Sequence, residues 1–279
     1  MGHSVVNLTG HPERHNPFGD RVTVAPLDFN RTEALARSLE GAEVLYNTYW
    51  IRFAHGPVTF DTAVRNSRAL VRAAEDAGVR RIVHISITNA SSASPLPYFR
   101  GKGLVEEAVQ QSRTSHAIIR PAVVFGAEDI LINNIAWFLR RLPVFPVFGG
   151  GDYPLQPVFV EDLAEIAVGA VQASGDVEMD AVGPETLTFN EMLRLICDAV
   201  GSKALLAHLP PALAYGLSRL VGYAIRDVVI TRDEIEGLMA GLLVSTERPT
   251  AHTRLSQWLS RNAETVGARY ASELQRHYR

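Results

Sequence analysis

Short apolar runs rich in β-branched residues alternate with longer stretches of helical periodicity through the first half of the chain. This alternation predicts strand–helix–strand units, and such crossover connections make neighbouring strands parallel. We therefore expect an α/β fold built on a doubly wound parallel sheet. The strand-like runs are 4–8, 21–25, 43–46, 81–85, 117–119 and 158–160, and the helical stretches are 32–39, 62–77 and 103–111.

The pattern changes after Gly126. Helical stretches near 131–141 and 162–173 are followed by a mainly helical tail from residue 188 onward. The pairs Gly183-Pro184 and Pro210-Pro211 mark turns or boundaries in this part. A chain of 279 residues can bury a full core, so we expect one globular unit with a smaller, mainly helical lobe.

Composition argues against several classes of protein. The net charge of −3 disfavours a nucleic-acid binder, which needs a strongly basic face. The single cysteine, Cys197, excludes an intrachain disulfide and a cysteine-based metal cluster, and the histidines lack metal-binding spacing. We expect no metal. No apolar run is long enough for a membrane span and no signal-sequence pattern is visible, so we expect a cytoplasmic protein.

Tyr98 and Lys102 form the most specific motif. They frame a Tyr-x-x-x-Lys spacing, and Lys203 is the only other lysine of the chain. Residues four apart share a helix face, so the ammonium can lie beside the phenol oxygen. A nearby cation lowers a tyrosine pKa from about 10 toward the range in which the phenol exchanges protons with a substrate. The alternative is a solvated lysine one turn from a packed tyrosine.

Ser86 and Thr88 come directly after the strand-like run 81–85. In open α/β sheets, ligands bind at the loops beyond the carboxyl ends of the strands. A hydroxyl from either residue would then face Tyr98 across the same crevice.

These motifs resemble those of the extended short-chain dehydrogenases/reductases, the NAD(P)-dependent epimerase/dehydratase family. The matching blocks are a strand leading to Ser/Thr (86–88), Tyr-x-x-x-Lys (98–102), Arg-Pro-x-x-x-Phe-Gly (120–126) and Val-x-Val-x-Asp-Leu-Ala (158–164). The resemblance is closest to the branch that includes the accessory NAD(P)H-binding subunit of respiratory complex I. It implies a Rossmann-like NAD(P)-binding domain over 1–182, with 127–156 inserted into a substrate lobe that 183–279 completes.

One departure bears on the cofactor. The family opens with a strand, a Gly-x-x-Gly-x-x-Gly turn and a helix, which together bind the cofactor pyrophosphate. Here the first strand-like run, 4–8, already resembles the family's second strand. We therefore expect the central strand to be absent, so that 5–8 and 44–46 either border a gap or are forced together. A reading frame that begins upstream, with Met1 as an internal start, would supply the missing strand, glycine-rich turn and helix.

The resemblance also implies cofactor contacts. Besides Tyr98 and Lys102, the expected cofactor-binding residues are Asp28, Asn47, Thr48, Pro121 and Val123. Asp28 would bind the adenine amino group, although a turn residue before a helix is an equal alternative. Residues 8–11 include no acidic side chain for a ribose 2′-hydroxyl, and Arg14 could reach a 2′-phosphate. The expected cofactor is NAD or NADP, with NADP favoured.

Two functions follow. In the first, Tyr98 exchanges a proton, Lys102 lowers its pKa and binds the nicotinamide ribose, and Thr88 or Ser86 holds the oxygen of a small-molecule substrate during hydride transfer. In the second, the chain is a non-catalytic dinucleotide-binding or assembly protein. The substrate is not encoded in any motif. Family members often pair through the helices that correspond to 62–77 and 103–111, which implies a homodimer.

Overall fold

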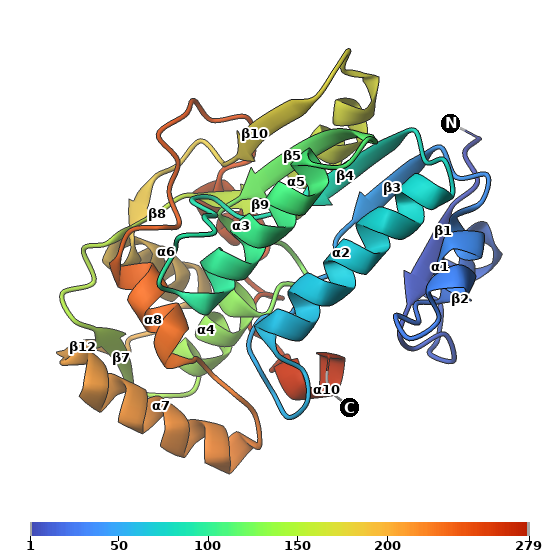
Figure 1. Ribbon diagram of the computed structural model, residues 1–279. Coiled ribbons are helices and arrows are strands. Elements are labelled where there is room, and N and C mark those ends of the chain that lie inside the picture. The colour runs from blue at the N-terminus through green and yellow to red at the C-terminus, as the bar shows by residue number, and fades with distance from the viewer. Residues whose placement is uncertain (1, 278–279) are drawn as a thin grey trace.

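A four-stranded parallel sheet lies at the centre of the chain, whose residues 2–277 are described by a computed structural model (Figure 1). Its strand order is β10–β5–β4–β3. All three strand pairs are parallel. The α/β class predicted from the alternation is confirmed. The strands are β3 (Val44–Asn47), β4 (Arg81–Ile85), β5 (Ser115–Pro121) and β10 (Val177–Ala181).

Helices cover both faces of this sheet, because side chains alternate between the faces along each strand. Ile82 and Ile118 point into one core with helices α1 (Thr32–Leu39), α2 (Phe60–Asp76) and α3 (Pro97–Gln110). Val83, Ala117 and Ile119 point into another core with α5 (Val160–Gly169) and the 3-10 helix η2 (Ala170–Gln172). This two-sided burial explains why consecutive apolar residues run through β4 at 82–83 and through β5 at 117–119.

The strands β1 (Val6–Thr9) and β2 (Thr23–Pro26) form a separate parallel pair, with the 3-10 helix η1 (Gly19–Arg21) between them. Within residues 2–277, β1 pairs only with β2, and β3 pairs only with β4. The expected gap between 5–8 and 44–46 is thus confirmed, and Figure 1 shows the β1–β2 unit standing apart from β3. Val6 of β1 and Tyr46 of β3 are 49% and 43% exposed.

A second hydrophobic core contains residues that come before and after β10 in the sequence. It is built around Phe125, Leu155, Met192 and Trp258. Three two-stranded pairs border this lobe: β6–β9, β8–β11 and β7–β12. Its elements are β6 (Val123–Phe125), α4 (Leu131–Leu139), β7 (Val144–Phe148), β8 (Pro154–Leu155), β9 (Pro157–Phe159), β11 (Leu187–Thr188), α6 (Phe189–Val200), β12 (Leu205–Leu209), α7 (Pro211–Ile225), α8 (Arg232–Met239), α9 (Leu255–Arg261) and α10 (Glu273–His277). The boundary at 182 remains a prediction.

Two predicted elements need correction. The run 158–160 contributes to β9, which pairs with β6, and β10 takes the place beside β5. The periodicity missed β10 because, as an edge strand, it carries exposed and half-buried polar side chains. Helix α3 begins at Pro97 rather than 103, since proline fits the first turn of a helix. Among residues 2–277, no helix has the length and apolar character needed to cross a membrane.

Candidate functional site

The candidate site lies at the carboxyl ends of β3, β4 and β5, beside the first two turns of α3. Parallel strands bring these ends to one edge of the sheet. The edge carries Asn47 at the end of β3, Ser86 just beyond β4 and Pro121 at the end of β5. Because α3 starts early, Tyr98 and Lys102 both lie on it.

Lys102 is 3% exposed. Its Nζ donates to the Ile85 carbonyl oxygen at 2.8 Å and lies 5.0 Å from the centroid of the Trp50 ring. Burial lowers the pKa of Lys102 from 10.5 to about 7, and the negative charge of Glu106 opposes that fall only in part. The ammonium has three N–H donors, of which only one has a hydrogen-bond acceptor within residues 2–277.

Tyr98 is half-buried, and its ring contacts those of Trp50, Phe60 and Phe99. Its hydroxyl makes no hydrogen bond to any residue of the described chain. Burial raises the pKa of Tyr98, and the negative charge of Glu234 adds to the rise. The lowered pKa expected from the motif is therefore not present in the chain alone, where the phenol stays protonated.

Trp50 lies between Tyr98 and Lys102. A Cβ on Gly101 would come within 2.8 Å of the Trp50 ring, so the glycine between the two motif residues is what admits the indole. The Trp50 Nε1 is buried and has no hydrogen-bond partner within residues 2–277. Sequence reasoning missed Trp50. The one signal for it was a glycine inside a helix, which often marks a close packing contact.

Ser86 and Thr88 have different partners. The Ser86 Oγ is buried and finds no hydrogen-bond acceptor or donor in the part of the chain described. The Thr88 hydroxyl donates to the Leu242 carbonyl oxygen at 2.9 Å, and the Asn89 side chain donates to Leu242 and Val244. Thr88 therefore holds the second lobe against the end of β4, whereas Ser86 keeps its hydrogen-bonding capacity for another group.

Asn47 pairs with His84, a residue that the sequence analysis did not select. The Asn47 amide nitrogen lies 3.1 Å from His84 Nδ1. An amide nitrogen only donates, so Nδ1 accepts and the neutral ring carries its proton on Nε2. Burial, with a further contribution from Lys102, lowers the pKa of His84 to about 3. The buried Nε2 has no partner among residues 2–277.

Three of the expected cofactor-binding residues make their contacts elsewhere than at Tyr98. Asp28 follows β2 in the separate β1–β2 sheet, where Arg31 binds it at 2.7 Å and, as the larger cause, lowers its pKa. Thr48 is exposed, and Val123 is buried in the second core. Pro121 is at the site, where its carbonyl oxygen accepts the Thr88 backbone N–H at 2.9 Å.

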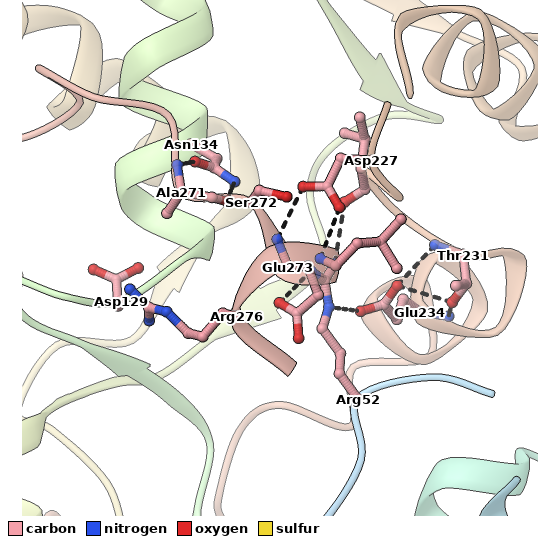
Figure 2. Close-up of polar contacts among 12 residues, drawn as sticks. Arg52, Asp129, Asn134, Asp227, Thr231, Glu234, Ala271, Ser272, Glu273 and Arg276 are labelled. Atoms are coloured by element: carbon pink, nitrogen blue, oxygen red, sulfur yellow. Dashed lines mark hydrogen bonds and ion pairs between the residues drawn. The ribbon is translucent and has the colours of Figure 1, made fainter. Parts of the chain in front are cut away.

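Figure 2 shows a charged network that ties the end of the chain to the loop after β3. Arg52 donates to Glu234 of α8 at 2.5 Å, to Glu273 of α10 at 3.2 Å and to the Val229 carbonyl oxygen at 3.1 Å. Asp227 accepts the backbone N–H groups of residues 273 and 274. The network was not predicted, because its members lie far apart in the sequence.

The site suits the nicotinamide and ribose of a dinucleotide better than its pyrophosphate. The unsatisfied atoms of Trp50, His84 and Ser86 and the two spare donors of Lys102 are polar groups suited to a ribose and a carboxamide ring. For the pyrophosphate, the strand, glycine-rich turn and helix that the family uses do not occur between residue 2 and β1. Within the described chain, no three His, Cys, Asp or Glu side chains are grouped to hold a metal ion.

Known proteins are similar to this chain in sequence and in fold. A family model described as NAD(P)H-binding matches residues 1–129. The mitochondrial NADH dehydrogenase (ubiquinone) 1 alpha subcomplex subunit 9 of Arabidopsis thaliana is 26% identical over 250 residues, or 84% of this chain and 62% of that protein. The ceramide reductase of Caulobacter vibrioides is 29% identical over 192 residues, or 68% of this chain and 60% of that protein. The chain thus spans less than two thirds of the length of either relative.

The fold has solved counterparts. The crystal structure of the Citrobacter sp. triphenylmethane reductase complexed with NADP(H) has a TM-score of 0.73 at 18% identity, over 92% of this chain and 90% of that one. Residues 1–129 thus match an NAD(P)H-binding family, the chain is homologous to complex I subunits over most of its length, and it shares its fold with the triphenylmethane reductase.

Proposed function

We propose that this chain is an NAD(P)-dependent oxidoreductase of the short-chain dehydrogenase/reductase type, acting on a hydroxyl or carbonyl group of a small molecule. Tyr98 is the proton-transfer group, Lys102 holds the nicotinamide ribose, and Ser86 or Thr88 binds the reacting oxygen. NADP is the preferred cofactor, a homodimer through α2 and α3 is the expected assembly, and the cytoplasm is the expected location.

The observation that supports this proposal is the incomplete bonding of Lys102. An ammonium that is 3% exposed costs several kcal/mol to desolvate, yet only one of its three donors is used within residues 2–277. A bound ribose would supply hydroxyl acceptors to the other two. Such a ligand would also raise the pKa of Lys102, since a hydrogen bond to the charged form favours that form.

The chemistry of the residues follows from their surroundings. When bound, the dinucleotide supplies or accepts the hydride. The protonated Tyr98 hydroxyl, which is free of protein partners in the described chain, would donate its proton to the carbonyl oxygen as that oxygen gains negative charge. A charged Lys102 beside the resulting phenolate would stabilise it. Ser86, whose Oγ is unsatisfied, is better placed than Thr88 to donate to the same oxygen.

The two lysines provide a matched binding test. NADPH binding is followed by energy transfer from tryptophan, with Trp50 against the Lys102 side chain as a donor. Lys102→Met should weaken binding at least tenfold, and the exposed Lys203→Met should leave it unchanged. Equal effects of the two substitutions would refute the role of Lys102.

The catalytic role needs its own test. NADPH oxidation is measured with a panel of aldehydes, ketones and quinones. Tyr98→Phe removes only a hydroxyl, so it should leave NADPH binding intact and reduce turnover of any accepted substrate by about 100-fold or more. Unchanged turnover in this variant would show that Tyr98 has a packing role.

A second candidate function is a dinucleotide-binding or assembly subunit without turnover. The raised pKa of Tyr98 and the placement of Trp50 against both motif residues favour it. In this case Lys102→Met would still weaken NADPH binding, while no compound of the panel would be reduced.

A further inference from the structure

Helix α7 presents an apolar face to solvent. It packs through Ala214, which shares a small core with Phe148 of β7 and Ile235 of α8. Its opposite face carries Leu213, Leu217, Leu220 and Tyr223, which are 53%, 40%, 69% and 89% exposed. Leu213, Leu217 and Leu220 follow the spacing i, i+4, i+7 and form one stripe. Figure 1 shows α7 along the outer border of the second lobe, away from the central sheet.

The remaining exposed residues of α7 do not resemble a solvated helix face. They are Ala212, Gly216, Arg219 and Ala224, with Arg226 at the C-cap. A helix that faces water normally carries charged and polar side chains on its outer side. A contiguous exposed apolar surface on a folded protein marks an interaction site.

The segment that carries this stripe has charge of one sign. From residue 201 to residue 226 there is no Asp or Glu, although the chain has 30 acidic residues. Arg219 and Arg226 are seven positions apart, and therefore lie two turns apart on the same side of the helix. Both are exposed, and neither side chain makes a hydrogen bond or ion pair with residues of the described chain. Their long side chains are suited to reach from an apolar surface to phosphate groups.

We propose that α7 docks the protein on an anionic lipid bilayer. The helix would lie in the plane of the interface, with the leucine stripe and Tyr223 among the acyl chains and the two arginines at the headgroups. The charge pattern disfavours a second copy of the chain as the occupant. In a two-fold pairing the same patch meets itself, so its arginines would face each other with no acidic residue from 201–226 to pair with.

The test is flotation of the full chain with phosphatidylcholine vesicles, with and without phosphatidylserine. We expect binding to the vesicles with phosphatidylserine, and weaker binding when salt is added or phosphatidylserine is left out. Arg219→Gln should weaken binding to the anionic vesicles about fivefold and leave binding to pure phosphatidylcholine unchanged. Tyr223→Trp should give a fluorescence blue shift on the anionic vesicles.

Introducing negative charge into the stripe gives the sharpest contrast. Leu217→Glu with Leu220→Glu should reduce vesicle binding at least tenfold. Val168→Glu is the control, because Val168 is 52% exposed on α5 and should keep full binding. Thermal melting checks that each variant folds, and the Arg219 and Tyr223 variants test the proposal even if the leucine variants do not.

Three results would overturn the proposal. The first is no binding of the unaltered chain to phosphatidylserine vesicles at low salt. The second is equal binding by the leucine and Val168 variants. The third is a dimer in sedimentation that the leucine variant converts to a monomer while neither form binds vesicles, which would assign the stripe to a second copy.

Discussion

Lys102 should titrate near neutral pH in the folded protein. Its Nζ is held away from water between the Ile85 carbonyl oxygen and the Trp50 ring, and no carboxylate is within ion-pair distance of it in the described chain. Glu106, one turn away, forms its ion pair with Arg120 at 2.6 Å instead. Because burial disfavours the charged form, the pKa of Lys102 falls from 10.5 to about 7.

This lowered pKa links stability to pH. Between about pH 7 and 10.5, the unfolded chain binds a proton on Lys102 that the folded chain does not bind. The free energy of unfolding therefore rises with pH through this window. The difference between the two pKa values corresponds to on the order of 3–5 kcal/mol. Lys102→Met removes this dependence, so the stability advantage of the variant should be largest below pH 7 and should shrink as the pH rises.

The composition makes the titration directly measurable. Lysine labelled with carbon-13 at Cε gives only two resonances, because Lys102 and Lys203 are the only lysines. Lys203 is exposed and serves as the internal reference. Lys203→Met assigns the signals. Urea unfolding of the original chain and of Lys102→Met across the same pH range supplies the stability difference.

Two outcomes would refute the reasoning. If the Lys102 resonance titrates only at high pH, Lys102 is solvated or paired in solution. If the Lys102 resonance titrates near 7 but the stability difference between the two chains does not change with pH, the lysine has a similar pKa in the unfolded chain.

Three further predictions concern packing and cofactor binding. Arg52→Met should destabilise the fold by about 2–4 kcal/mol in urea unfolding, because it removes the cation that binds Glu234 and Glu273. Arg113→Met is the control, because its side chain is 88% exposed and its loss should cost less than about 0.5 kcal/mol. Equal effects would place the Arg52 network in solvent. Gly103→Ala should destabilise the fold by about 2 kcal/mol or more, since its Cβ would lie 2.3 Å from the backbone at Ser91. The control Gly216→Ala, whose Cβ would have nothing within 4 Å, should be neutral or stabilising. A neutral Gly103→Ala would contradict this packing. NADPH binding should tighten at least tenfold in a fluorescence titration when a strand, glycine-rich turn and helix are grafted ahead of β1. The reason is that each charge-assisted amide contact to pyrophosphate contributes about 1.5–3 kcal/mol. Low-micromolar binding by the ungrafted chain would contradict this prediction.

The parts of the fold that the sequence predicted are those with a strong local signal. Helix α1 and strand β4 match their predicted bounds of 32–39 and 81–85. Helix α1 buries Leu35 and Leu39 at helical spacing, and β4 buries the adjacent apolar residues Ile82 and Val83 on its two faces. Strand β10 and the start of α3 were missed, because an edge strand is partly polar and because the prolines before Tyr98 were not read as a helix start.

The candidate site was predictable only in part, for a similar reason. Its motif residues stand at fixed local spacing, so Tyr98, Lys102 and Ser86 could be selected. Trp50 and Arg52 could not, because their positions depend on contacts with α3 and with the C-terminal helices. The pKa of Tyr98 depends in the same way on burial and on Glu234, which no local pattern reveals.

The split between β1 and β3 has a consequence for handling the protein. Each strand offers a row of backbone donors and acceptors on one side that no strand of residues 2–277 uses. The exposed side chains nearby, Val5, Val6 and Tyr46, are apolar or aromatic, and none of the lysines or prolines that commonly protect sheet edges lies on either strand. Extended segments of other chains can add to such edges. At high concentration this chain should therefore form strand-mediated aggregates, and a soluble peptide of matching β-propensity should suppress them by occupying the same edges.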